Sequence, residues 1–264
     1  AASDVYKRQT VAQACRRHSL FHVKHAKKEQ LDMNIDFKPY FQEYEALRAT
    51  ADAVSKKVSS AFPLEFKCQP QCDDCCYALF DLTLIEALYI NHQFHRQLSD
   101  DQRAAIIEKA NHADRRLYKI KRDAAREAGQ GKSEEEIIDR MGRIRIRCPL
   151  LNDENMCALY DARPITCRLY GIPLAIGGKG RTCGISGFKP GESYPTVSMD
   201  KLTHALYGLS ARLVREIQSR HHRMGEILVP LSMALLTEYN ETYLGIGPEK
   251  EPEPVRHRKK GIAR

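Results

Sequence analysis

The stretch Cys68-Gln-Pro-Gln-Cys72-Asp-Asp-Cys75-Cys76 decides how this chain folds, because it gathers four thiols within nine residues. Separations of three or four residues let a turn aim two sulfurs at one point, as a tetrahedral thiolate site requires. Side chains of adjacent residues usually diverge, so Cys75 and Cys76 are not expected to serve one small ion together. We expect one of the two to face a second metal, to join a polynuclear cluster or to stay free.

A second group of four cysteines follows at separations of 9, 10 and 16 residues. These spacings match no standard zinc finger, but four plus four thiols are the number that two complete tetrahedral sets need. Zinc sites and iron–sulfur clusters both accept thiolates alone, so the metal stays open between zinc and iron. Disulfides would need an oxidising compartment, for which the sequence gives no sign. The predicted metal ligands are Cys68, Cys72, Cys75, Cys76, Cys148, Cys157, Cys167 and Cys183.

The order of these motifs resembles the YkgJ-type cysteine-cluster family, described as a zinc- or iron-chelating domain. The matching pieces are Cys-x3-Cys-x2-Cys-Cys, then Cys-Pro-Leu-Leu, then Cys-Ala-Leu-Tyr-Asp-Ala-Arg-Pro-Ile-Thr-Cys-Arg-Leu-Tyr. The resemblance covers roughly residues 33–190 and implies that the first seven of these eight cysteines, Cys68 to Cys167, are ligands, with Cys183 as the eighth. The family often has two residues between its first two cysteines, where this chain has three. It implies no assigned reaction, although related domains have been linked to flagellin lysine methylation and to iron–sulfur oxidoreductases.

Outside the cysteine segments the pattern is helical. Apolar residues from Phe37 to Val58 repeat at helical spacing, with Asp36 as the expected N-cap and Pro63 as the stop. Capping-box pairs then predict three helix starts, at Thr83 with Glu86, Ser99 with Gln102 and Ser133 with Glu136.

The second half of the chain reads differently. Residues 143–147 alternate as a short strand would, and residues 148–196 are loop-rich, with a short helix near Pro164. Two helices follow, over 202–217 and from Pro230 to Tyr239. We therefore predict a mainly α fold, a single helical domain with a cysteine-rich, loop-rich metal-binding lobe and short β segments.

Charge divides the chain into three parts. The net charge is +8, but residues 1–32 and 249–264 carry most of it, so the body is nearly neutral and nucleic acid is not an expected partner. Residues 1–32 are interpreted as an extension that the natural protein lacks, its start being Met33. Residues 33–246 are the expected metal-binding domain, with its cysteine lobe at 64–80 and 148–190. Residues 247–264 are an expected disordered basic tail.

The function predicted from these features is metal binding with no assigned reaction, because no paired carboxylates or nucleophile–base couple indicate catalytic residues. One alternative is an iron–sulfur enzyme of redox or methyl-transfer type, and a weaker one is an adaptor that uses metal as scaffold. Cys68-x3-Cys72-x2-Cys75 also fits radical SAM enzymes, which would require a large parallel barrel. We expect a cytoplasmic protein with no membrane segment and a metal ion as its partner; a protein partner is unknown.

Several other residues have a functional and an ordinary interpretation. Arg163, Arg168 and Arg181 are expected either to pair with the thiolates or to form ordinary surface contacts. His92 and His95 are interpreted as surface or packed side chains rather than ligands. The run Gly177-Gly178-Lys179-Gly180 is predicted to be a turn rather than a phosphate loop.

Overall fold

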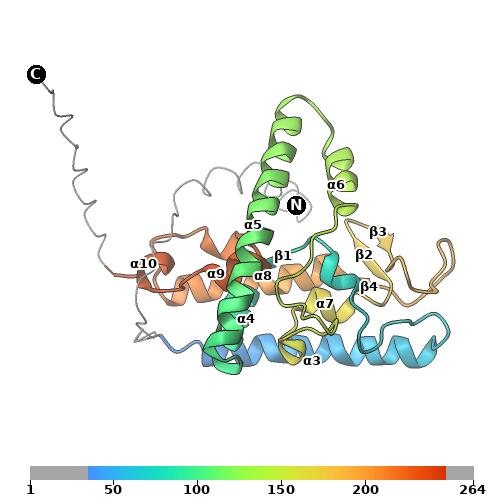
Figure 1. Cartoon of the computed structure of the whole chain (residues 1–264), viewed down its shortest axis with the longest axis horizontal. Coiled ribbons are helices and arrows are strands. Elements are labelled where there is room, and N and C mark those ends of the chain that lie inside the picture. Colours follow the sequence, from blue (N-terminus) through green and yellow to red (C-terminus); the bar gives the residue numbers. More distant parts are fainter. Residues whose placement is uncertain (1–34, 248–264) are drawn as a thin grey trace, which may run out of the picture.

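The computed structural model describes residues 35–247. The predictions for residues 1–32, for a start at Met33 and for the tail beyond Gly247 lie outside the described residues. Within the described part, helices make up most of the ordered structure and the strands are short (Figure 1). The prediction of a mainly α fold is confirmed.

The long helices form the body of the molecule and short helical turns connect the cysteine segments. The α-helices are α3 (Lys38–Ala61), α4 (Leu84–Gln97), α5 (Asp100–Gly129), α6 (Glu134–Gly142), α7 (Ile165–Leu169), α8 (Met199–Glu216), α9 (Leu231–Leu236) and α10 (Glu241–Leu244). The 3-10 turns are η2 (Asp74–Tyr77), η3 (Tyr160–Ala162) and η4 (Met224–Glu226).

Capping chemistry sets most of the helix starts. All three predicted capping boxes are present, at Thr83, Ser99 and Ser133, immediately before α4, α5 and α6. Helix α3 starts one residue later than predicted, since its N-cap is Phe37. The Asp36 carboxylate still accepts a hydrogen bond of 2.9 Å from the amide of Lys38, so it satisfies one free N–H of the first turn.

Two small sheets join distant parts of the chain. Strand β1 (Asp81–Thr83) pairs antiparallel with β5 (Leu228–Pro230), with Leu82 opposite Val229. Strand β2 (Leu174–Ile176) pairs antiparallel with β3 (Lys179–Arg181) and parallel with β4 (Val197–Ser198). No sheet formed by residues 35–247 has more than three strands, so this part of the chain contains no parallel barrel.

The glycine run is a turn, as predicted. Gly177 and Gly178 connect β2 and β3 with φ values of 58° and 75°, a two-residue hairpin geometry that favours glycine at both positions. The amide of Gly177 donates to the Asp200 carboxylate at 3.0 Å, which ties the hairpin to the first turn of α8. The run is therefore an anchored hairpin turn.

The predicted strand at 143–147 is wrong. These residues form no strand; instead, the amide of Ile146 donates to the Tyr77 carbonyl at 3.1 Å and that of Cys148 to the Cys76 carbonyl at 2.7 Å. The segment pairs on one side only, with a 3-10 turn that offers no regular ladder. The alternating pattern thus belongs to a segment without regular secondary structure, whose amides donate hydrogen bonds to carbonyls of η2.

Helix α9 is shorter than predicted and ends at Leu236, before Tyr239. The side-chain amide of Asn91, buried on α4, donates to the carbonyls of Ala234 at 2.9 Å and Thr237 at 3.1 Å. This side-chain amide satisfies carbonyl groups that the helix leaves without a partner at its end. The chain then continues in an extended conformation at Thr237.

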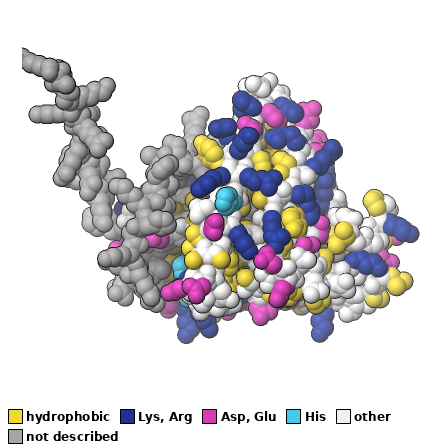
Figure 2. Space-filling model, in the orientation of Figure 1, with side chains coloured by type: hydrophobic (Ala, Val, Ile, Leu, Met, Phe, Trp, Pro, Cys, Tyr) yellow, Lys and Arg dark blue, Asp and Glu magenta, His cyan; other side chains and the backbone are white. Residues whose placement is uncertain are grey.

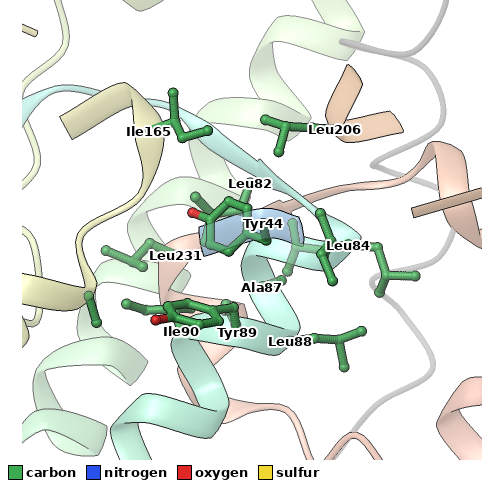
Figure 3. Close-up of a cluster of buried hydrophobic side chains, with 14 of the residues drawn as sticks. Tyr44, Leu82, Leu84, Ala87, Leu88, Tyr89, Ile90, Ile165, Leu206 and Leu231 are labelled. Atoms are coloured by element: carbon green, nitrogen blue, oxygen red, sulfur yellow. The ribbon is translucent and has the colours of Figure 1, made fainter. Parts of the chain in front are cut away.

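Helix α4 lies at the centre of the hydrophobic core. It packs on α3, α8 and α9, and its residues Leu84, Ile85, Ala87 and Phe94 are fully buried. Figure 3 shows Tyr44 of α3, Leu82 of β1 and Ile165 of α7 around this helix. Ile165 is the first residue of α7, so the core fixes the short helix that carries Cys167.

Charged side chains cover the face formed by α5 and α6. Figure 2 shows Lys and Arg there beside Asp and Glu. Glu127 on α5 pairs with both Lys132 and Arg140, and Lys179 pairs with Glu135. Opposite charges therefore offset much of the positive charge on this face. Within the described residues, no helix has the length and apolar content to cross a membrane.

Candidate metal centre

The two parts of the cysteine lobe lie against each other. Besides the amide bond from Cys148 to Cys76, the amide of Gly187 donates to the Glu65 carbonyl at 2.7 Å. Gly171 lies so close to Cys68 that an added Cβ would be 2.8 Å from the Cys68 Cβ. Residues 64–80 and 148–190, far apart in sequence, therefore form one unit.

Four of the cysteines form an inner group: Cys76, Cys148, Cys157 and Cys167. The charges of Cys148 and Cys157 act on both Cys76 and Cys167, and Cys148 and Cys157 also pack against the hydrophobic core. A bridge between Leu151 and Cys157, with the Ala158 amide bonded to the Leu150 carbonyl at 2.8 Å, folds this segment back on itself. The fold thus collects thiols that span about 90 residues of sequence.

The other four cysteines form an outer group: Cys68, Cys72, Cys75 and Cys183. They line a small pocket together with Tyr170 and Gly171. The thiol of Cys183 donates to the Asp74 carboxylate, with an Sγ to Oδ2 distance of 3.4 Å. Each group therefore mixes cysteines from both halves of the sequence motif.

Cys75 is where the two groups meet. The thiols of Cys167 and Cys76 donate hydrogen bonds to it and lower its pKa to about 3. The same hydrogen bond raises the pKa of Cys167 well above its usual value, while burial raises that of Cys148 to about 12. These hydrogen bonds thus favour a thiolate at Cys75. A second thiolate beside it would need a nearby cation to offset the repulsion between the two negative charges.

A salt bridge stands next to the outer group. Arg145 Nη2 lies 2.5 Å from Asp74 Oδ1 and also donates to the Asp74 carbonyl at 3.0 Å. Tyr170 contacts the same carboxylate, and its pKa is raised to about 12, mainly by burial and then by the charge of Asp74. The sequence analysis did not single out Arg145 or Tyr170. Arg145 is one of the alternating residues 143–147, and that alternation is the sequence feature that could have drawn attention to it.

The three arginines singled out in the sequence have different surroundings. Burial raises the pKa of Cys68 and Cys157, and the charge of Arg163 opposes this rise. The Arg163 guanidinium lies over the Tyr160 ring at 3.6 Å. Arg168 pairs with Asp52 at 2.5 Å and Arg181 with Asp139 at 3.8 Å. Arg163 thus lies near the thiols, whereas Arg168 and Arg181 form ion pairs, and Arg168 also donates to the carbonyls of Arg163 and Asp161.

Buried polar groups of the helical body position the inner cysteines. Arg48 of α3 donates to the Asp161 carbonyl and to the Tyr89 hydroxyl. Glu86 accepts from the Ile165 amide at 3.4 Å, in addition to its capping bonds. These bonds hold both ends of the segment that leads into α7. The sequence marked Glu86 only as a cap and gave no signal for Arg48.

The sulfurs converge without a closed coordination shell. Among residues 35–247, no group of three or more His, Cys, Asp or Glu side chains is already arranged so that it could hold a metal ion. All eight cysteines of the described part are free thiols and partly buried. The donor chemistry fits a soft cation such as zinc or iron, and the side chains would have to move to close a site.

The histidines stand apart from this centre. His92 and His95 are exposed residues of α4 whose rings contact Phe41 and Phe94. They agree with the interpretation as surface or packed side chains.

The described residues thus combine a helical body with a cysteine-rich lobe. Residues 67–184 match the family model CxxCxxCC, described as "Putative zinc- or iron-chelating domain". The matched segment contains all eight cysteines of the lobe, so the resemblance seen in the sequence is confirmed over this segment. No curated protein and no solved structure matches the chain in the same comparisons.

Proposed function

We propose that this domain binds zinc or iron directly through the thiolates of its eight clustered cysteines, and that the bound metal holds the cysteine lobe together. The observation that carries the proposal is the convergence of Cys148, Cys157 and Cys167 on the Cys75–Cys76 turn. Eight free thiols also suit a reducing compartment, so we place the protein in the cytoplasm.

Charge supports a resident cation. Thiols that bind metal lose their protons, and several thiolates at close range repel one another unless a cation lies among them. Arg163 supplies one positive charge near Cys68, Cys75 and Cys157. A single guanidinium cannot offset eight thiolates, whereas divalent zinc or iron ions offset two charges each.

The first part of the lobe, residues 64–80, has no core of its own, whereas residues 148–190 contribute Leu159, Ile165 and Leu169 to the hydrophobic core. Residues 64–80 are exposed or partly exposed, and Leu64 is 79% exposed. In such a segment the free energy of metal binding becomes free energy of folding, on the order of 10–16 kcal/mol for structural zinc in small zinc-finger peptides. The proposed role of the metal is therefore structural, with the helical body as support.

The test is metal analysis of the full chain purified without oxygen, together with its visible spectrum. We expect bound zinc, or bound iron with thiolate absorption bands. The control is Cys15→Ser, which removes a thiol outside the matched segment and should leave the metal content unchanged. A folded chain that takes up neither zinc nor iron would refute the proposal.

Chelation gives a second readout. Removing the metal should increase hydrogen exchange in 64–80 and 148–190, while α4, buried in the body, keeps its protection. If exchange in these segments does not change after complete chelation, the metal has no structural role. Bound iron with stoichiometric sulfide would instead favour the iron–sulfur alternative.

A further inference from the structure

The adjacent pair Cys75 and Cys76 raises a geometric question that the structure answers. Both residues lie in η2, yet only Cys75 lines the pocket with Cys68, Cys72 and Cys183. Cys76 instead lies with Cys148 and Cys157, and its carbonyl accepts a hydrogen bond from the Cys148 amide. The two neighbouring thiols thus belong to different groups of four.

We propose that the eight thiols form two tetrathiolate metal sites of unequal exposure, an inner site of Cys76, Cys148, Cys157 and Cys167 and an outer site of Cys68, Cys72, Cys75 and Cys183. The inference rests on the proposed function and deepens it. Each site takes one zinc- or iron-class ion with four sulfur ligands. The ligands of each site come from both halves of the motif rather than from one half each.

The inner site is fixed by the body of the protein. Cys148 and Cys157 pack against the core, and Cys167 lies on α7, whose first residue Ile165 is 1% exposed. The Cys148 amide reaches the Cys76 carbonyl at 2.7 Å, so backbone contacts hold these two residues together. An ion at this site is surrounded by fixed elements and should exchange slowly.

The outer site is held by turns. The Cys72 amide donates to the Gln69 carbonyl at 3.0 Å, and Gln71 has a φ of 70°, so the chain reverses between Cys68 and Cys72. Cys183 follows the β2–β3 hairpin, and as a protonated thiol it donates to the Asp74 carboxylate, a hydrogen bond that metal binding would replace. Because these four sulfurs line a surface pocket, an ion bound there is accessible to chelators.

The two sites adjoin at Cys75. Its sulfur faces the pocket and also contacts Cys76 and Cys167 of the inner group. Sulfurs around one tetrahedral zinc ion lie about 3.8 Å apart, from the zinc–sulfur length of about 2.3 Å. Neighbouring sites can therefore touch through this residue while each keeps four ligands.

The experiment compares the full chain with Cys72→Ser and Cys183→Ser as outer variants, Cys157→Ser as an inner variant and Cys15→Ser as the control. Each protein is titrated with cobalt(II), whose bands report thiolate coordination. A separate zinc-loaded sample of each protein is exposed to a colorimetric chelator that reports zinc release. We expect two ions for the wild-type chain and the control, released in a fast and a slow phase. The outer variants should keep one ion, the slow phase and the cooperative unfolding transition of the helical body.

The inner variant should lose the slow phase and most of the thermal stability of the lobe. If Cys157→Ser fails to fold, the outer variants still decide the question. Loss of all metal in Cys72→Ser or Cys183→Ser, or two ions retained in both, would overturn the division into two sites. A wild-type chain that binds no metal would refute the proposed function instead, whereas metal lost in a single phase refutes only the division.

Discussion

Gly171→Ala offers a sharp test of how tightly the two halves of the lobe pack. The added Cβ would lie 2.8 Å from the Cys68 Cβ and 3.2 Å from a ring carbon of Phe66. Carbon atoms in ordinary contact are about 3.5–4.0 Å apart, so the methyl group overlaps Cys68 by about 0.7 Å or more. The flanking residues Leu169 and Ile172 are fully buried, so the Gly171 backbone cannot retreat and Cys68 must move.

The expected cost is about 1–3 kcal/mol of unfolding free energy, as for overpacking elsewhere. The shift also exceeds the tolerance of about 0.2 Å in metal–ligand distances, so metal affinity should fall. Urea unfolding and cobalt titration of the full chain measure the two effects. The matched control is Gly184→Ala, beside Cys183, where an added Cβ meets no atom within 4 Å. Equal stability and equal metal affinity in the two variants would refute the reasoning.

Three further changes test other parts of the structure. Ser99→Ala removes the capping box of α5 and should cost about 1 kcal/mol in urea unfolding, and no loss would contradict the assigned cap. Burial raises the pKa of Glu86, so its contribution to stability is greatest below its unfolded pKa and is lost as pH rises through the folded pKa. Glu86→Gln should flatten this pH dependence in thermal melts while the exposed Glu136→Gln does not, and parallel curves for wild type and Glu86→Gln would count against it. Asp74→Asn should weaken metal binding about tenfold or more through loss of the salt bridge to Arg145, whereas Asp73→Asn should not; equal affinities would remove the positioning role.

Local signals in the sequence predicted the helical body well. The start of α4 depends on Thr83 and Glu86, which lie three residues apart, so the information is contained within one turn. The same holds for the hairpin at Gly177 and Gly178. The end of α9 could not be predicted in this way, because Asn91, about 140 residues earlier, accounts for it.

The grouping of the cysteines could not be predicted from the sequence either, because it also depends on contacts between residues far apart in the chain. Spacing shows that Cys75 and Cys76 diverge, but only the fold shows that Cys148 approaches one of them. Likewise Arg145 reaches Asp74 across 71 residues, and Arg48 reaches Asp161 across 113. Partners brought together by tertiary folding leave no periodic trace in the chain.

The ribbon of β1 and β5 has a consequence for how the metal is acquired. It anchors Asp81 opposite Pro230, and α3 ends at Ala61, so the four cysteines from Cys68 to Cys76 lie on a short span fastened at both ends to the helical body. Closing so short a tethered span costs little entropy, and opening it disturbs few apolar contacts. The helical body can therefore fold before a metal ion binds. Binding or release of the ion would then change the structure of the cysteine lobe and leave the helical body folded.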